Sequence, residues 1–410
     1  MRRKIANLNI VVSLALLSLT PASLVNAHGE RSQEPFLRML SVQWYDTEWS
    51  TDKLAVNEEM TLTGKFHLHT GWPEAIAKPD VAFMHVYAPG PVFVRKGVWV
   101  NGEPLVRSAP YEIGRDYEYK IILKARRPGN HHVHPMLNIK YGGPNAGPGN
   151  WVEITGDAAD FENPVTTLTG ETVNLETWGW SRVRNWHIMW AVIAAFWLVW
   201  WLRRPLLAGR NILLRQGRED ELITPMDKKV GLGLGILTLA LIAYGYFSTI
   251  DKYPITIPLQ AGLMELEPLP VDEETVDVEL VRANYDIPGR SVRMTIDVTN
   301  RAENPIRLGE FSTASIRWLN GSIAPDVGPY PQDLIALNGL EIDDDTPIPP
   351  GETRTLDVIA TDAAWETERL AYLIYDPDSR FGGMLFFYDS NGKRHKQTFG
   401  GPLIPSFTAI

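Results

Sequence analysis

Two long apolar runs in the middle of the chain constrain its fold more than any other feature. Residues 186–202 contain one ionisable side chain, His187, and residues 230–247 contain none. Each run is close to the length that a helix needs to cross the hydrocarbon core of a bilayer. Tryptophans gather towards the ends of the first run, as interfacial residues do. The pattern predicts two transmembrane helices; the alternative is a helical hairpin buried in a soluble core.

The connector between the two runs, residues 203–229, is rich in basic side chains. Short connectors with many Lys and Arg residues stay on the cytoplasmic side of a membrane. We therefore expect a transmembrane hairpin over 185–249, with the parts before and after it together on the periplasmic side. The basic residues of the connector are Arg203, Arg204, Arg210, Arg215, Arg218, Lys228 and Lys229.

The N-terminus has the features of a secretory signal. Basic residues at 2–4 precede an apolar stretch at 10–19, and Val25 and Ala27 supply the small side chains of a cleavage site. The pattern predicts a signal peptide over 1–27, with His28 as the first residue of the mature chain. The alternative, an uncleaved anchor helix, is disfavoured because the apolar stretch is short for a bilayer span.

The parts on either side of the hairpin, 28–172 and 265–410, have strand-like patterns. Apolar and polar residues alternate over 117–123 and again over 292–298, and a further strand is expected at 353–359 after a Pro-Pro-Gly turn. A helix is predicted at 362–374. The fold class is therefore mainly β, with two sandwich domains joined by the helical hairpin.

Composition narrows the chemistry. The chain has no cysteine, which excludes disulfides, iron–sulfur clusters, Cys-based zinc sites and the thiolate of blue copper. Any bound metal must be held by histidine nitrogen and by oxygen ligands. The net charge of −10 argues against nucleic acid as a partner, because phosphate binding needs clustered basic side chains.

Most of the nine histidines lie in the first β part, which places any metal chemistry there. His132 and His134 are two residues apart on an expected strand, so that they share a face, whereas His131 points to the other face. His67 and His69 repeat this spacing and either could approach the same site, although core or surface positions are favoured. Histidines of the first part are His28, His67, His69, His85, His131, His132 and His134.

A mature N-terminus at His28 would add a strong chelating group. Its α-amino group, with an ordinary pKa of about 7.7–8.0, and its imidazole can bind one ion together. With His132 and His134 they form an all-nitrogen site that suits copper, although zinc accepts similar ligands. In the other β part, the acidic run 343–345 could bind calcium, but a solvated turn is the favoured interpretation.

At these residues the sequence resembles the B subunits of the copper-containing membrane monooxygenases, the family of ammonia and particulate methane monooxygenases. The resemblance covers the whole mature chain. It is carried by HGERSQ at 28–33, the His-Val-His segment within 124–138, NPVTTLTG at 163–170, KYPITIP at 252–258 and DPDSRF at 376–381.

The resemblance implies two cupredoxin-like β-barrel or sandwich domains, the first of which binds copper through His28, His132 and His134. It implies assembly with two membrane-embedded subunits, A and C, as a trimer of heterotrimers in the inner or an intracytoplasmic membrane. Quinol is the implied electron donor and ammonia or methane the implied substrate. No catalytic residue is assigned to this chain, because the resemblance leaves open which of the subunits activates oxygen.

One departure bears on the substrate. Methane-oxidising members often have a further histidine just before Trp-Tyr-Asp, where this chain has Gln43. That glutamine and the doubled His131-His132 favour ammonia oxidation to hydroxylamine over methane oxidation to methanol, and they disfavour a second copper. A periplasmic copper-binding or copper-delivery protein is the alternative from another functional class.

Overall fold

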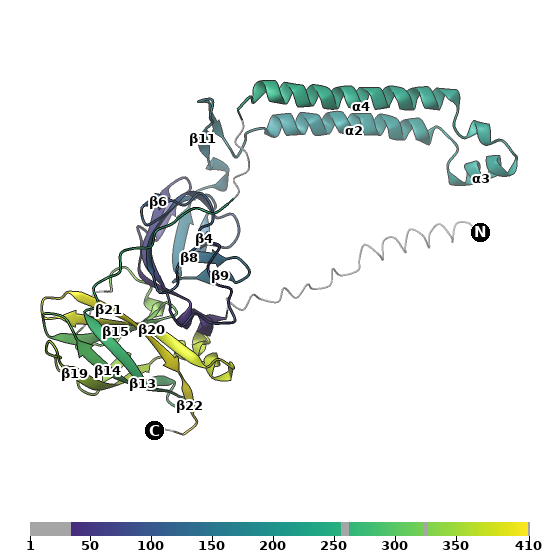
Figure 1. Ribbon diagram of the computed structural model, residues 1–410. Helices are drawn as coiled ribbons and strands as arrows, with labels where there is room; N and C mark the ends of the chain where they lie inside the picture. The colour runs from purple at the N-terminus through teal and green to yellow at the C-terminus, as the bar shows by residue number, and fades with distance from the viewer. Residues whose placement is uncertain (1–33, 256–261, 324–326, 409–410) are drawn as a thin grey trace. The chain divides into compact units, whose positions relative to one another are not determined.

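The computed structural model describes residues 34–255, 262–323 and 327–408 (Figure 1). The described residues form two compact units: one contains those up to Ala158 and from Gly262 onward, with both β domains, and the other contains those between them, with the long helices. The predicted signal peptide and His28 lie outside the described residues.

The N-terminal β domain, residues 34–158, packs two sheets around an apolar core after a short 3-10 helix, η2 (Pro35–Leu40). In β7 the side chains of Tyr117, Tyr119 and Ile121 are fully buried, so the predicted alternation produces the core face. One sheet has the order β1 (Val42–Trp49), β3 (Glu59–Leu68), β7 (Asp116–Ala125), β5 (Phe93–Val100) and β6 (Glu103–Pro104). The other has the order β2 (Lys53–Ala55), β10 (Asn150–Thr155), β8 (Gly129–Ile139) and β4 (Ala82–Tyr87), and β9 (Gly143–Ala146) also pairs with β8.

The C-terminal β domain, residues 276–408, is a second sandwich. Its core holds a stack of aromatic rings in which the centroids of Trp318 and Trp365 are 4.6 Å apart and those of Phe311 and Trp318 are 5.3 Å apart. One sheet has the order β18 (Leu340–Ile342), β19 (Thr353–Thr361), β14 (Ser291–Asn300), β13 (Val276–Asp286) and β22 (Ile404–Ser406). The other has the order β17 (Ile335–Ala336), β16 (Ile316–Leu319), β15 (Ile306–Thr313), β20 (Arg380–Asp389) and β21 (Arg394–Pro402).

The predicted helix at 362–374 is wrong as a single element. The structure has a one-turn helix, α5 (Ala364–Thr367), followed by a 3-10 helix, η6 (Leu370–Tyr375). Between them Arg369 has a left-handed backbone with φ of 58°. That conformation cannot continue a right-handed helix, so the segment breaks there.

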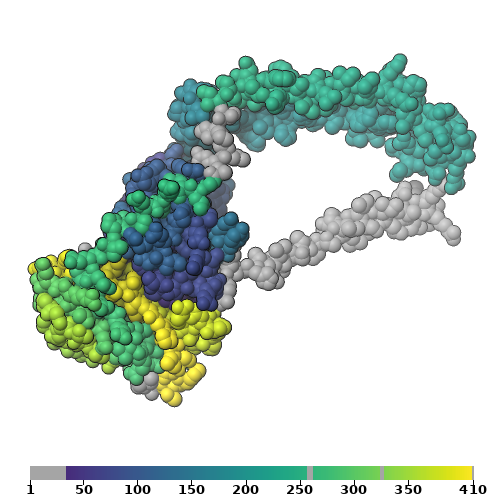
Figure 2. All heavy atoms as spheres, viewed as in Figure 1, coloured from purple at the N-terminus to yellow at the C-terminus, as the bar shows by residue number. Residues whose placement is uncertain are grey.

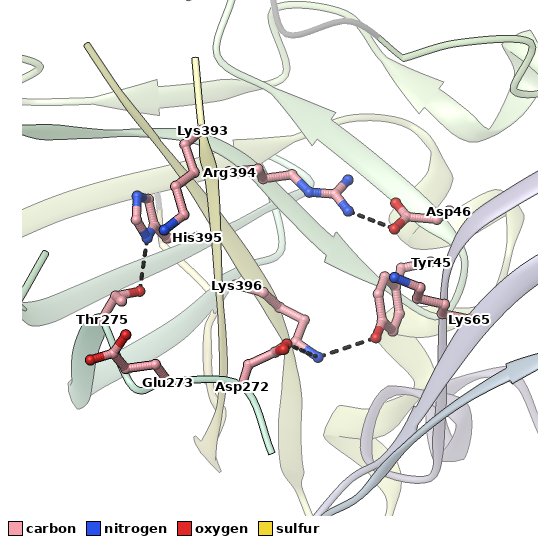
Figure 3. A pocket seen from close by; sticks show the side chains of 10 residues that line it. All are labelled: Tyr45, Asp46, Lys65, Asp272, Glu273, Thr275, Lys393, Arg394, His395 and Lys396. Carbon is pink, nitrogen blue, oxygen red and sulfur yellow. Dashed lines mark hydrogen bonds and ion pairs between the residues drawn. The ribbon is translucent and has the colours of Figure 1, made fainter. Parts of the chain in front are cut away.

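The two β domains contact each other directly. Figure 2 shows yellow atoms of the C-terminal domain against purple atoms of the N-terminal domain. Around a cavity of about 250 Å³, Arg394 of β21 forms an ion pair of 2.6 Å with Asp46 of β1, and Lys396 donates to the Tyr45 hydroxyl at 3.2 Å (Figure 3). Lys396 also pairs with Asp116 of β7 at 2.5 Å. Two ion pairs, Arg394 with Asp46 and Lys396 with Asp116, thus connect the two domains beside this cavity.

The second unit contains two helices that are long and apolar enough to cross a membrane, α2 (Trp180–Leu202) and α4 (Pro225–Lys252). Their apolar stretches have no buried residues, as expected of surfaces that face lipid or other helices. Asp227 joins the ends of the two helices, because its Oδ1 accepts from Arg204 at 2.7 Å and from Trp200 at 2.9 Å.

A hairpin of β11 (Pro164–Thr166) and β12 (Thr172–Asn174) precedes α2, and α3 (Leu207–Arg215) and η4 (Glu219–Glu221) lie between the long helices. The predicted architecture, mainly β with two sandwich domains and a two-helix hairpin, is confirmed.

Candidate metal centre

His132 and His134 face each other from one side of β8. His134 Nε2 lies 2.9 Å from His132 Nδ1, and the two rings are perpendicular with centroids 4.4 Å apart. The strand period of two places both side chains on the same face. His131 is turned away from the pair, and its Nε2 is 3.4 Å from the Pro128 carbonyl oxygen.

The surroundings of His134 define its tautomer. Its Nδ1 lies 2.9 Å from the carbonyl oxygen of Gly147, which can only accept a hydrogen bond. Nδ1 is therefore assigned the proton, and Nε2 presents its lone pair to His132. With no ion bound, His132 Nδ1 donates a hydrogen to that lone pair. A metal ion can take the place of this hydrogen, so the two facing nitrogens fit the imidazole donors that copper and zinc prefer.

A turn of two glycines and one proline packs against the pair. Gly147, Pro148 and Gly149 connect β9 to β10 and are buried. A Cβ atom at Gly149 would overlap the Cε1 atoms of both imidazoles, and one at Gly147 would lie 2.7 Å from the Trp44 ring. The space beside this turn is filled by the two imidazoles.

The electrostatics keep His134 neutral. Burial, together with the electrostatic influence of His132 and Arg38, lowers the pKa of His134 from 6.5 to about 4, against the opposing hydrogen bond to Gly147. His134 is therefore uncharged at neutral pH, as a metal ligand must be. Arg38 of η2 approaches this side of the domain, since its Nη1 donates to the Ala146 carbonyl at 3.4 Å.

Two aromatic side chains flank the histidines. Trp151 on β10 is directly opposite His132, with ring centroids 4.9 Å apart, and Tyr87 on β4 is opposite His134 at 6.1 Å. About half of each aromatic side chain is exposed, 54% for Trp151 and 55% for Tyr87. No local sequence pattern points to either residue, because only the strand register places them beside the histidines.

The other histidine pair is part of the core. His67 is buried, with its Nδ1 3.2 Å from Asp116 Oδ2, and it pairs across the strands with Gln43. His69 is also buried, and its Nε2 is 3.0 Å from the Phe399 carbonyl oxygen. Within the described residues, no group of three or more His, Cys, Asp or Glu side chains is arranged to hold a metal ion. The third predicted ligand, His28, lies outside those residues.

The acidic run in the C-terminal domain has partners of its own. Asp343 accepts from the Asp357 backbone N–H at 2.9 Å, Asp344 accepts from the Thr346 hydroxyl at 2.6 Å, and Asp345 pairs with Arg307. These carboxylates stabilise a turn, which agrees with the interpretation favoured over a calcium site.

Comparisons with known proteins relate nearly the whole chain to one protein family. The family model for the B-subunit proteins of monooxygenases matches residues 29–407. The chain is 48% identical over 383 residues to the "Particulate methane monooxygenase alpha subunit" of Methylococcus capsulatus (strain Bath), a match that covers 93% of this chain and 92% of that relative.

Two solved structures resemble parts of the chain. The cupredoxin domain of amoB from Nitrosocaldus yellowstonii matches with 18% identity and a TM-score of 0.25, covering 32% of this chain and 98% of that one. A PapD-like domain of human CEP192 matches with 10% identity and a TM-score of 0.16, covering 37% of this chain and 99% of that one.

Proposed function

Because the chain belongs to the family of monooxygenase B-subunit proteins, we propose that it is the component of a copper-dependent membrane monooxygenase complex that binds copper through His28, His132 and His134. The observation that carries the proposal is the distance of 2.9 Å between the facing nitrogens of His132 and His134. When bound, copper supplies one-electron redox chemistry that none of the side chains here provides.

The position of η2 supports the third ligand. Arg38 of η2 contacts Ala146, which directly precedes the turn around the histidine pair. Only a short stretch separates His28 from Glu34, where the described chain begins, and an extended segment of that length reaches about 20 Å. After cleavage at Ala27, the amine and imidazole of His28 would complete the nitrogen ligands.

The helical hairpin supports the proposed partners and location. The uncovered apolar surfaces of α2 and α4 suit contact with lipid and with two membrane-embedded subunits, A and C, in a trimer of heterotrimers. The basic connector supports an orientation with the closed end of the hairpin in the cytoplasm and both β domains in the periplasm. Quinol in the same membrane is the proposed electron donor.

The proposed substrate is a small uncharged molecule, and different observations support the two candidates. Gln43 before Trp44, together with the doubled His131-His132, supports oxidation of ammonia to hydroxylamine. The identity of 48% to a relative named as a methane monooxygenase subunit supports oxidation of methane to methanol. Turnover of the intact complex with both substrates in competition separates the two, and turnover of neither would overturn the proposal.

The ligand assignment is tested in the intact complex by metal content. Replacing both His132 and His134 by Ala should remove copper from the site, whereas the matched control His131→Ala should retain it because that ring is turned away. Equal copper in all three proteins would refute the assignment. Native purification addresses the copper-delivery alternative: a chain that is isolated with copper but without two hydrophobic partners supports delivery and contradicts the complex.

A further inference from the structure

The turn Gly147-Pro148-Gly149 is fastened to β8 on both sides of His134. At one end the Gly147 N–H donates to the Pro135 carbonyl at 2.8 Å. At the other end β10 begins with Asn150 paired to Val133. Residues 133 and 135 are the chain neighbours of His134, so the turn and this imidazole share one rigid frame.

The Gly147 carbonyl contacts only one of the two ring nitrogens of His134, Nδ1. It accepts from His134 Nδ1 at 2.9 Å and thereby leaves the Nε2 lone pair directed at His132. A histidine that binds metal commonly donates its other ring hydrogen to a carbonyl oxygen, which fixes the tautomer and makes the binding nitrogen a better donor.

Gly149 acts on both rings through its missing side chain. The Cε1 atoms of His132 and His134 occupy the space that a Cβ atom at this position would take. Since Cε1 is bonded to both ring nitrogens, contact at this atom limits rotation of each imidazole. The backbone of the turn thus fixes the orientation of the two facing nitrogens before an ion binds.

We infer that Gly147 and Gly149 are positioning residues: the carbonyl of one selects the tautomer of His134, and the absent side chain of the other fixes the angle between the two imidazoles. The inference rests on the proposed function, since it assigns a purpose to the geometry of the proposed ligands. A site assembled in advance binds its ion without the cost of ordering two side chains.

The first test reads the tautomer with no metal present. The full chain, labelled with ¹⁵N at its nine histidines and held in lipid nanodiscs, gives imidazole nitrogen shifts by NMR. We expect the His134 hydrogen on Nδ1, in the wild type and also in His132→Ala, which adds no bulk and removes the neighbouring ring. A hydrogen on Nε2 in His132→Ala would show that the carbonyl does not select the tautomer.

The second test reads the angle between the rings. In Gly149→Ala we expect an altered copper(II) EPR spectrum and affinity for copper about 10–100-fold weaker, the range seen when the partners of metal ligands are removed. Pro148→Ala is the matched control, because it keeps both the Gly147 carbonyl and the bare Gly149. Melting curves of the metal-free proteins show whether each variant folds.

The outcomes separate the two proposals. Wild-type copper affinity and spectrum in a folded Gly149→Ala would overturn the role of the turn, even if His132 and His134 bind copper. Conversely, a fixed His134 tautomer in a chain whose copper content does not depend on His132 and His134 would overturn the copper site instead. If Gly149→Ala fails to fold, the tautomer in His132→Ala decides.

Discussion

The His69 imidazole in the N-terminal β domain donates its Nε2 hydrogen to the Phe399 carbonyl oxygen of the C-terminal β domain, at 3.0 Å. The direction follows from the other ring nitrogen, since His69 Nδ1 accepts the Gly71 N–H at 2.8 Å. Gly382 and Gly400 of the C-terminal domain leave room for the ring, because a Cβ atom at either would lie 3.0 to 3.1 Å from it. One neutral histidine thus links the two sandwiches.

This link predicts a pH dependence of stability. Burial, with the charges of His67 and Arg380, lowers the pKa of His69 to about 4 from 6.5, against the opposing hydrogen bond to Phe399. The unfolded chain therefore takes up a proton before the folded one. The contribution of His69 to the free energy of unfolding is fully present above about pH 6.5. It falls as the pH drops from there to about 4, by about 3 kcal/mol in total. Thermal melts of the wild type and of His69→Gln should converge at acidic pH; parallel curves would contradict the assignment.

A second prediction concerns the ion pair between the domains. Asp116 accepts from Lys396 at 2.5 Å and from the Tyr45 hydroxyl at 2.7 Å. Burial raises the pKa of Asp116, but His67 and Lys396 outweigh it and hold that pKa well below its usual range. A double-mutant cycle of Asp116→Asn and Lys396→Met should give a coupling energy of about 0.5–3 kcal/mol in unfolding, because the pair is largely shielded. The same cycle on the exposed pair Arg218 and Glu221 should give no measurable coupling. Equal values for the two pairs would show that the domain contact is no stronger than a surface pair.

Copper binding should be visible in tryptophan fluorescence. The Trp151 ring lies 4.9 Å from the His132 ring, so a copper ion on that histidine should quench its emission. We expect part of the emission of the purified complex to fall as copper is restored, and Trp151→Phe to abolish that part of the change. Trp178→Phe, which replaces a similarly exposed ring, should leave the quenching intact. Undiminished quenching in Trp151→Phe would place the copper elsewhere.

Membrane orientation can be read with introduced thiols, because the chain has no cysteine of its own. Gln216→Cys lies in the connector between the long helices, and Glu303→Cys lies on an exposed loop of the C-terminal domain. In spheroplasts, a membrane-impermeant maleimide should label Glu303→Cys at once and Gln216→Cys only after permeabilisation. The reverse pattern would invert the proposed topology.

Local patterns in the sequence predict the parts of the fold that depend on local rules. Alternation in 117–123 predicts the buried face of β7, and the apolar runs predict α2 and α4. The single helix predicted at 362–374 is wrong, because no local pattern marks Arg369 as the left-handed residue at which the segment breaks.

The candidate site, too, is only partly predictable from local sequence patterns. The spacing of His132 and His134 is enough to place them on one face of a strand. The contacts of Trp151, Tyr87 and Gly149 with these histidines depend on strand register and on the path of a turn. Both are set by tertiary packing, and no motif in the sequence encodes them.

Asp227 gives the membrane hairpin a mechanical property. Its carboxylate is bonded to Arg204 and Trp200 at the end of α2 and caps α4 through Thr224. A slide of one helix past the other by a single turn, about 5.4 Å, would break the bonds to Arg204 and Trp200, whereas the cap with Thr224 lies within α4 and would move with it. The two helices are therefore coupled at this end, and a force on either helix along its axis displaces both.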